Sequence, residues 1–256
     1  MSNINNKYYL ISPEQLLKLR FGKSYNKIVS EIPCHSIISF FDNSISLIEK
    51  DFEIITKINW FGNYSKLIIF CYLDTPISLI TLPPSPSLAS MALEELIFCG
   101  VKNVISIGVA GSINAQIKPH DIVIPTESYM DEGIAKFYTS NNFYTSCSKT
   151  IIKSIEHVMQ QLKLVYHKGL CWSISTPYRE SIQSINEFQK EKVICVDMES
   201  ASLFAIAEHY NMNLSSIFFI SDTIENEIWT PHFKSKKTSK MKKLLLEIAL
   251  QSIINS

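Results

Sequence analysis

Two acidic side chains, Glu199 and Asp222, each follow a short apolar segment of the chain. The first segment has the sequence VICVDME (residues 193–199), and the second ends in Ile220-Ser221-Asp222. Short apolar runs of this kind are typical of buried strands in parallel sheets, and open α/β folds bind ligands at the carboxyl ends of such strands. We therefore predict that both carboxylates lie at the mouth of one pocket, where they can hold positive charge or exchange a proton.

Each acid also has an explanation that involves no ligand. Asp222 is followed three residues later by Glu225, a spacing similar to that of a capping box. Asp197 and Glu199 could likewise stabilise the first turn of the following helix through its dipole. Capping explains each acid separately, but it does not predict that the acids converge.

A glycine-containing segment, Gly108-Val109-Ala110-Gly111, follows another predicted strand. Glycines at such a position allow the backbone to pass close to a ligand, or they simply turn the strand tightly. The residues alone leave both explanations open.

The loop at residues 172–180 (WSISTPYRE) contains an aromatic ring, several hydroxyl groups and one of the two arginines of the chain. Tyr178 and Arg179 could stack on a planar heterocycle and donate hydrogen bonds to it. The alternative is a proline-containing loop that leads into a helix capped near Thr176.

Apolar runs alternate with amphipathic segments along the chain, which favours an α/β fold with a mainly parallel or mixed sheet. The predicted strands are Ser36–Phe41, Lys66–Tyr72, Ile77–Leu82, Val104–Ile107, Asp121–Ile124, Lys168–Trp172, Val193–Val196 and Leu214–Ile220. The predicted helices are Ser87–Cys99, Ser148–Leu162, Arg179–Lys190, Ser200–Tyr210 and Ser239–Ile253. We expect residues 1–35 to be an extension packed on a single domain formed by residues 36–256.

Composition restricts the function classes. The 256 residues are 46% hydrophobic and carry 24 basic and 24 acidic side chains, so the formal net charge is zero and a nucleic-acid-binding surface is not expected. The apolar runs are far shorter than the ~20 residues that span a bilayer. The first residues have no apolar signal region, so a soluble, cytoplasmic protein is expected. The six cysteines form no CxxC pair and the histidines are scattered, so no metal site is predicted.

Several blocks of the sequence resemble one protein family. Residues 104–133 read VISIGVAGSINAQIKPHDIVIPTESYMDEG, residues 196–207 read VDMESASLFAIA, and residues 220–222 read ISD. Together they resemble the purine nucleoside and uridine phosphorylase family, which includes nucleoside hydrolases such as methylthioadenosine nucleosidase. The loop WSISTPYRES is similar to a WTTDAPYRET-like loop in one branch of that family. The likeness extends from about Ser36 to Ile253.

The resemblance implies a single three-layer α/β/α domain with a mixed, partly barrel-like sheet, assembled into dimers, trimers or hexamers. It implies an enzyme that cleaves the N-glycosidic bond of a small nucleoside, with no cofactor and at most phosphate as a co-substrate. The family's ribose-binding pair falls on Met198 and Glu199. Its base-handling aspartate falls on Asp222, after Ser221, and the loop residue that contacts a base edge falls on Arg179.

The departures from the family pattern concern phosphate. The family's Gly-Asp-Pro-x-Arg loop is replaced by Phe41-Asp42-Asn43-Ser44-Ile45, and a family arginine falls on Ser106. The hydroxyl residue after the first glycine falls on Val109, and the Gly-x-Pro at a helix start is replaced by Ser85-Pro86-Ser87. A phosphate dianion needs charged donors or a nest of backbone N–H groups. Arg20 is the one arginine outside the pattern that could substitute.

These departures lead to three hypotheses. The first is a nucleoside hydrolase in which Asp42 activates the attacking water. The second is a phosphorylase with a rearranged phosphate site. The third is a family member that binds a nucleoside-like ligand, serves as a sensor or storage protein, or performs different chemistry. Asp222 favours a purine, because a carboxylate suits a ring nitrogen that gains a proton, whereas Arg179 would suit a base carbonyl.

Overall fold

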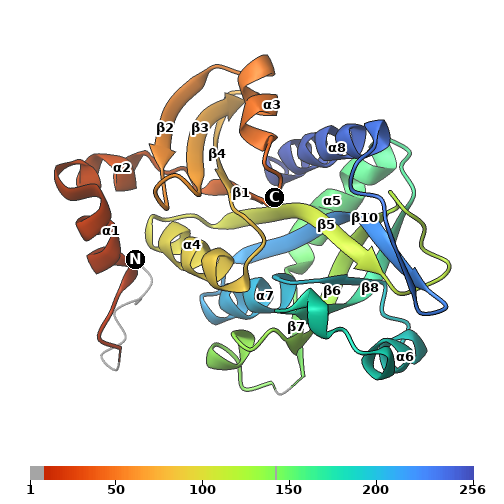
Figure 1. Cartoon of the computed structure of the whole chain (residues 1–256). Helices are drawn as coiled ribbons and strands as arrows, with labels where there is room; N and C mark the ends of the chain where they lie inside the picture. The colour runs from red at the N-terminus through yellow and green to blue at the C-terminus, as the bar shows by residue number, and fades with distance from the viewer. Residues whose placement is uncertain (1–8, 142) are drawn as a thin grey trace.

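The computed structural model describes residues 9–141 and 143–256. Within these residues the strands form a single eleven-stranded sheet (Figure 1). The strands are β1 (His35–Ser39), β2 (Ile54–Asn59), β3 (Lys66–Tyr72), β4 (Thr75–Thr81), β5 (Asn103–Ser112), β6 (Ile122–Asp131), β7 (Tyr144–Ser146), β8 (Tyr166–Ile174), β9 (Cys195–Asp197), β10 (Asn213–Glu225) and β11 (Ile228–Pro231).

One half of the sheet closes on itself. Strand β5 pairs with both β9 and β10, β10 pairs with β6, β6 with β8, and β8 with β9, so these five strands form a ring. The other half is open and runs outward from β5 through β1, β4, β3 and β2. Parallel and antiparallel pairs both occur. The predicted mixed, partly barrel-like sheet is confirmed.

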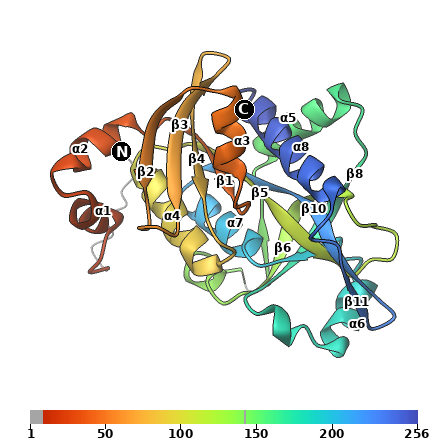
Figure 2. The same cartoon turned by 45° about the horizontal axis from the view of Figure 1, so that its top comes forward.

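Helices cover both faces of the sheet, as Figures 1 and 2 show. They are α1 (Pro13–Phe21), α2 (Tyr25–Glu31), α3 (Ser44–Asp51), α4 (Pro86–Phe98), α5 (Lys149–Gln161), α6 (Ile182–Lys190), α7 (Ser200–His209) and α8 (Lys236–Ile253). Helices α3, α5 and α8 bury an apolar core against one face, and α4 and α7 bury a second core against the other. This arrangement is the predicted three-layer α/β/α domain.

Local sequence explains where the helices near the cleft begin. The side chain of Ser85 accepts a hydrogen bond from the Leu88 N–H at 3.3 Å, and Pro86 occupies the first position of α4, where its missing N–H costs nothing. Residues 200–207 of helix α7 are all buried, as expected for a helix whose sequence is apolar on nearly every side.

The eight predicted strands and five predicted helices are present, with one shifted boundary that concerns the cleft. Helix α6 begins at Ile182 instead of Arg179, because Pro177–Arg179 form a short 3₁₀ turn and Ser181 caps the helix. Elements absent from the prediction are α1, α2, α3, β2, β7 and β11. Within the part of the chain that is described, no helix is both long and apolar enough to cross a membrane.

Candidate active site

A cleft of about 1390 Å³ opens at the ends of the ring strands. It is lined by residues 109–112 of β5, residues 196–199 at the end of β9 and just beyond it, and residues 221–222 of β10. Helix α6 and the β10–β11 hairpin complete its walls and lie on the same side of the molecule (Figure 2). Glu199 and Asp222 both line this one cleft.

Strand pairing explains why the two acids meet. Gly111 of β5 pairs with Val196 on one side and with Asp222 on the other. A Cβ atom at Gly111 would lie 3.1 Å from Oδ2 of Asp222, so a larger residue would force the carboxylate to move. The glycine therefore allows the carboxylate of Asp222 to lie directly over β5.

Asp197 fixes the segment that carries Glu199. Its Oδ2 accepts hydrogen bonds from the backbone N–H of Ser200 at 2.8 Å and of Glu199 at 3.3 Å, while its Oδ1 accepts from the hydroxyl of Ser173 and the thiol of Cys171. Asp197 is thus the capping acid at the start of α7, and Glu199 makes no such cap. The capping explanation applies to Asp197 and leaves Glu199 unexplained.

Glu199 is a buried acid without a compensating cation. Its relative exposure is 5%, and its Oε1 has no hydrogen-bond partner among the described residues. Burial, then the nearby charge of Asp197, raise the pKa of Glu199 well above its usual value, against a smaller opposing effect of the Ser85 backbone. Because buried polar atoms in proteins almost always have a partner, an unpaired oxygen on a residue that lines a cleft indicates a missing ligand group.

Asp222 is half-buried and has one donor on each carboxylate oxygen. The Ser221 hydroxyl donates to Oδ1 at 2.6 Å, and the indole N–H of Trp229 donates to Oδ2 at 2.9 Å. Trp229 belongs to β11, which forms an antiparallel hairpin with β10. The hairpin therefore holds the orientation of the carboxylate from the rim of the cleft.

Glu180 is a third acid of the cleft, and the sequence analysis did not select it. It follows Arg179 in the loop after β8 and lines the cleft. Burial, with a further contribution from the charge of Asp222, raises the pKa of Glu180 to about 7. A carboxyl group with this pKa carries a proton part of the time near neutral pH, so Glu180 and Asp222 together can both donate and accept.

The fold and the cleft agree with the comparisons to known proteins. The sequence pattern of the Phosphorylase superfamily matches residues 37–253. The chain belongs to this superfamily. It is 31% identical over 166 residues to a purine nucleoside phosphorylase DeoD-type of Thermoanaerobacter sp. (strain X514), covering 64% of this chain and 71% of that relative. It is 26% identical over 170 residues to the DeoD-type enzyme of Buchnera aphidicola subsp. Acyrthosiphon pisum (strain Tuc7), covering 66% and 71%.

A solved structure shares the fold of this superfamily member. The uridine phosphorylase from Vibrio fischeri ES114 aligns with a TM-score of 0.76 and 19% sequence identity, over 89% of this chain and 95% of that protein. At that identity the likeness concerns the fold alone. The large mixed sheet flanked by helices is therefore the architecture of the superfamily.

The other residues expected at a superfamily site fall in two groups. Met198, Val109, Ala110, Ser221 and Tyr178 line the cleft, Tyr178 with its ring almost fully exposed at the mouth. The structure does not bring the remaining two into the cleft lining. Gly108 lies against the side chains of Phe40 and Phe218. Arg179 is exposed and is not part of the cleft lining.

Two residues given roles in acceptor chemistry lie elsewhere. The Asp42 side chain is 87% exposed, is not part of the cleft lining, and accepts a hydrogen bond from Lys242 at 2.9 Å. Its position gives no support to a water-activating role. Arg20 forms two hydrogen bonds, of 2.7 and 2.8 Å, with the carboxylate of Glu95, so it does not substitute for a phosphate-binding arginine.

Two positions that the family resemblance relates to phosphate, Ser106 and Ser85, carry neutral hydroxyl groups that already form hydrogen bonds within the protein. The hydroxyl of Ser106 donates to the hydroxyl of Ser216 at 2.6 Å in the interior, and Ser85 caps α4. Among the described residues that line the cleft, Lys192 is the one basic side chain. Six lining residues are acids: Glu180, Asp197, Glu199, Asp222, Glu225 and Glu227. The lining therefore contains more acidic than basic side chains, although the pKa values of Glu180 and Glu199 are raised and Glu225 is paired with Lys118.

Glu180 and Trp229 are two of the lining residues that sequence reasoning missed. Glu180 stood in a loop already selected for Arg179, and an acid two residues before a helix has the same appearance as an ordinary dipole-stabilising residue. Trp229 belongs to a strand that was not predicted. Asn226-Glu227 between two short runs was the available signal, because an Asn at a two-residue turn favours a hairpin.

Proposed function

We propose that this protein cleaves the N-glycosidic bond of a nucleoside, with a preference for purines, and that water accepts the sugar. The acid-rich lining of the cleft carries the proposal: its described residues include six acids, two of them with raised pKa values, and one lysine. Such a site repels a phosphate dianion, which needs cationic donors. It stabilises a sugar that develops positive charge as the bond breaks.

The reaction needs three transfers. The bond between C1′ and the base nitrogen breaks with its electron pair going to the base, and the sugar becomes an oxocarbenium-like cation. The oxygen of water bonds to C1′ and loses a proton, while the base gains one. The products are the free sugar and the free base, so no further reactant is required.

Glu199 acts at the sugar end of the cleft. Its Oε1 accepts a hydrogen bond from a ribose hydroxyl. Among the six buried side-chain oxygens of the described residues that have no partner, this is the one that belongs to a cleft-lining residue. Binding of the hydroxyl group and the positive charge of the sugar both favour the ionised carboxylate. The interaction therefore strengthens as the transition state forms, which is the condition for an effect on turnover.

Glu180 and Asp222 act at the base end. Glu180, whose pKa is raised to about 7, supplies the proton that the departing base takes up. Asp222 accepts a hydrogen bond from the protonated ring nitrogen or from an exocyclic N–H group. This division of roles suits a purine, which presents ring nitrogens and N–H donors on the same edge.

Phosphorolysis is the second candidate function. It is favoured by the similarity to the DeoD-type purine nucleoside phosphorylases. In that case Lys192 is the cation available in the described cleft lining to bind phosphate.

The two functions are separated by their products. We would incubate the protein with inosine, adenosine, uridine and 5′-modified nucleosides, with and without phosphate, and measure the free base together with free sugar and sugar 1-phosphate. Release of base and free sugar in phosphate-free buffer is expected. Base release that strictly requires phosphate and yields sugar 1-phosphate would replace the hydrolytic proposal with the phosphorolytic one.

A further inference from the structure

All three tryptophans of the chain donate their indole N–H to a carboxylate. Trp60 donates to Glu95 at 2.6 Å, Trp172 to Asp131 at 3.1 Å and Trp229 to Asp222 at 2.9 Å. Trp60 and Trp172 have no exposed surface, so their N–H groups need a partner inside the protein. Trp229 is 57% exposed and could donate to water. Burial therefore does not account for its bond to Asp222.

The hairpin geometry directs Trp229 onto this carboxylate. In the β10–β11 pairing, Asp222 lies opposite Pro231 and Ile224 lies opposite Trp229. Asp222 and Trp229 are thus diagonal neighbours on one face of the hairpin, a separation that an aromatic side chain can bridge. Asn226 and Glu227 close the turn with φ of 50° and 63°. Asp222, Ile224 and Trp229 all line the cleft, so this face of the hairpin is the one turned toward it.

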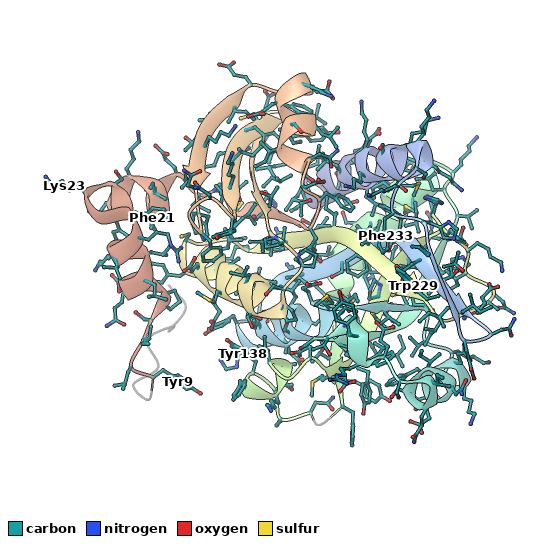
Figure 3. All side chains as sticks on the ribbon, viewed as in Figure 1. Tyr9, Phe21, Lys23, Tyr138, Trp229 and Phe233 are labelled. Carbon is teal, nitrogen blue, oxygen red and sulfur yellow. The ribbon has the colours of Figure 1, made fainter. Side chains whose placement is uncertain are left out.

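The ring of Trp229 is part of an aromatic rim. Its centroid lies 6.3 Å from that of Phe233, another cleft-lining residue, and the two lie close together in Figure 3, far from Phe21 and Lys23 of the N-terminal segment. Large exposed aromatic surface at the mouth of a polar cleft is suited to contact with a planar heterocycle.

We propose that Trp229 is a positioning residue for Asp222 and that its ring forms the wall of the base-binding end, which makes the β10–β11 hairpin a specificity element of the cleft. The indole N–H occupies one lone-pair direction of Oδ2, and the Ser221 hydroxyl occupies one of Oδ1. These two hydrogen bonds hold the carboxylate of Asp222 in one orientation, so its remaining lone pairs point in fixed directions toward a donor on the ligand. The inference rests on the proposed function in that the ligand carries a nucleobase.

Two substitutions separate the two parts of the role. Trp229→Phe removes the N–H and keeps a ring, whereas Trp229→Ala removes both. Ile228→Ala is the matched control, because Ile228 is exposed on the same strand and does not line the cleft. The measurements are kcat and KM for a purine nucleoside, and the change in tryptophan fluorescence on titration with that nucleoside or with the free base.

Trp229→Phe should lower kcat about tenfold with little change in KM, the size of one lost hydrogen bond to a charged group. Trp229→Ala should in addition raise KM about tenfold through loss of the stacking surface. Ile228→Ala should stay within about twofold of the wild type, as expected for an exposed residue outside the site. The ligand-dependent fluorescence change should disappear in both Trp229 variants.

The outcomes distinguish this inference from the proposed function. If a nucleoside binds and alters the fluorescence through Trp229 while none of the tested nucleosides is cleaved, with or without phosphate, the proposed function is refuted and the role of Trp229 is supported. Cleavage that proceeds with the same kcat and KM in both Trp229 variants would refute the role of Trp229 and leave the proposed function intact.

Discussion

Glu95 and Glu199 are both glutamates with almost no exposed surface. Glu95 belongs to the C-terminal half of helix α4, whereas Glu199 interacts with the backbone of Ser85 at the N-terminus of the same helix. Glu95 accepts two hydrogen bonds from the guanidinium of Arg20 and one from the indole of Trp60. Glu199 lies near the negative charge of Asp197, and among the described residues it has neither an ion-pair partner nor a donor to its Oε1. The same residue type is thus buried with and without compensation.

The difference teaches how a structural carboxylate is told from a functional one. Burial of a charge is costly unless it is paired, so a fully paired carboxylate such as Glu95 is explained by the fold itself. Its bonds with Arg20 join α1 to α4, and its bond with Trp60 joins α4 to the end of β2. The unpaired carboxylate of Glu199 is not explained by the fold, and its cost is offset only when a ligand supplies the missing groups.

The largest expected effect concerns the compensated acid. Glu95→Leu leaves the Arg20 guanidinium and the Trp60 N–H without an acceptor, and it should lower the free energy of unfolding by roughly 3 kcal/mol. This is the lower end of the usual range because the Arg20 side chain is 21% exposed and can turn toward water. Turnover at temperatures where the variant is folded should not change. Chemical denaturation measures the first quantity, and initial rates the second.

The double variant Arg20→Met/Glu95→Leu is the control for this pair. It removes the charge together with its partner, so it should recover much of the lost stability. A single variant as stable as the wild type would show that Glu95 is not a structural carboxylate.

The uncompensated acid should behave in the opposite way. Glu199→Gln should lower kcat/KM by about 10²–10³-fold, because the interaction with the cationic transition state is lost. Its pKa is raised in the folded protein, so the wild type loses stability as pH rises from the unfolded-state pKa toward the folded one. The glutamine variant lacks this loss, and it should be at least as stable as the wild type at about pH 8. Unfolding curves at acidic and alkaline pH test the sign, and a marked loss of stability at high pH would contradict it.

A smaller effect is expected for the third cleft acid. Because the pKa of Glu180 is raised to about 7, its protonated fraction falls as pH rises through that value. If the protonated form supplies the proton to the base, kcat/KM should fall about tenfold for each unit of pH above the pKa. Glu180→Gln should lower the plateau and abolish this alkaline limb. A limb that persists unchanged in the variant would assign the titration to another group.

Sequence reasoning was most successful where local pattern and burial agree. The eight predicted strands all belong to the central sheet and are mostly buried, and residues 200–207 of helix α7 are all buried. Strand β11 was missed because all four of its residues are exposed. In β2 the exposure alternates, but an exposed Ile55 and an inward Thr56 hide the alternation from the sequence. Helix α1 had a readable signal, since Ser12 and Gln15 form a capping box before an otherwise weakly amphipathic segment.

The site was harder to predict than the fold because position in a strand does not determine partners. The sequence placed Glu199 and Asp222 at strand ends, but it could not show that Gly111 pairs with both of their strands. It also could not show that Lys242, 200 residues away along the chain, engages Asp42. Long-range contacts of this kind depend on the assembled sheet, and they decide which acids are free for chemistry.

The smallest expected effect concerns Asp42, which differs from both Glu95 and Glu199 because it is an acid paired with a cation at the surface. Lys242 lowers the pKa of Asp42, so the pair adds stability above the unfolded-state pKa, which is lost as pH falls through the folded value. With the carboxylate 87% exposed, Asp42→Asn should change the free energy of unfolding by about 0.5 kcal/mol or less. Turnover should remain within about twofold of the wild type, since surface substitutions away from a site have small effects. A loss of kcat comparable to that of Glu199→Gln would instead return Asp42 to the mechanism as the base that activates water, and it would mean that the cleft is rearranged when substrate binds.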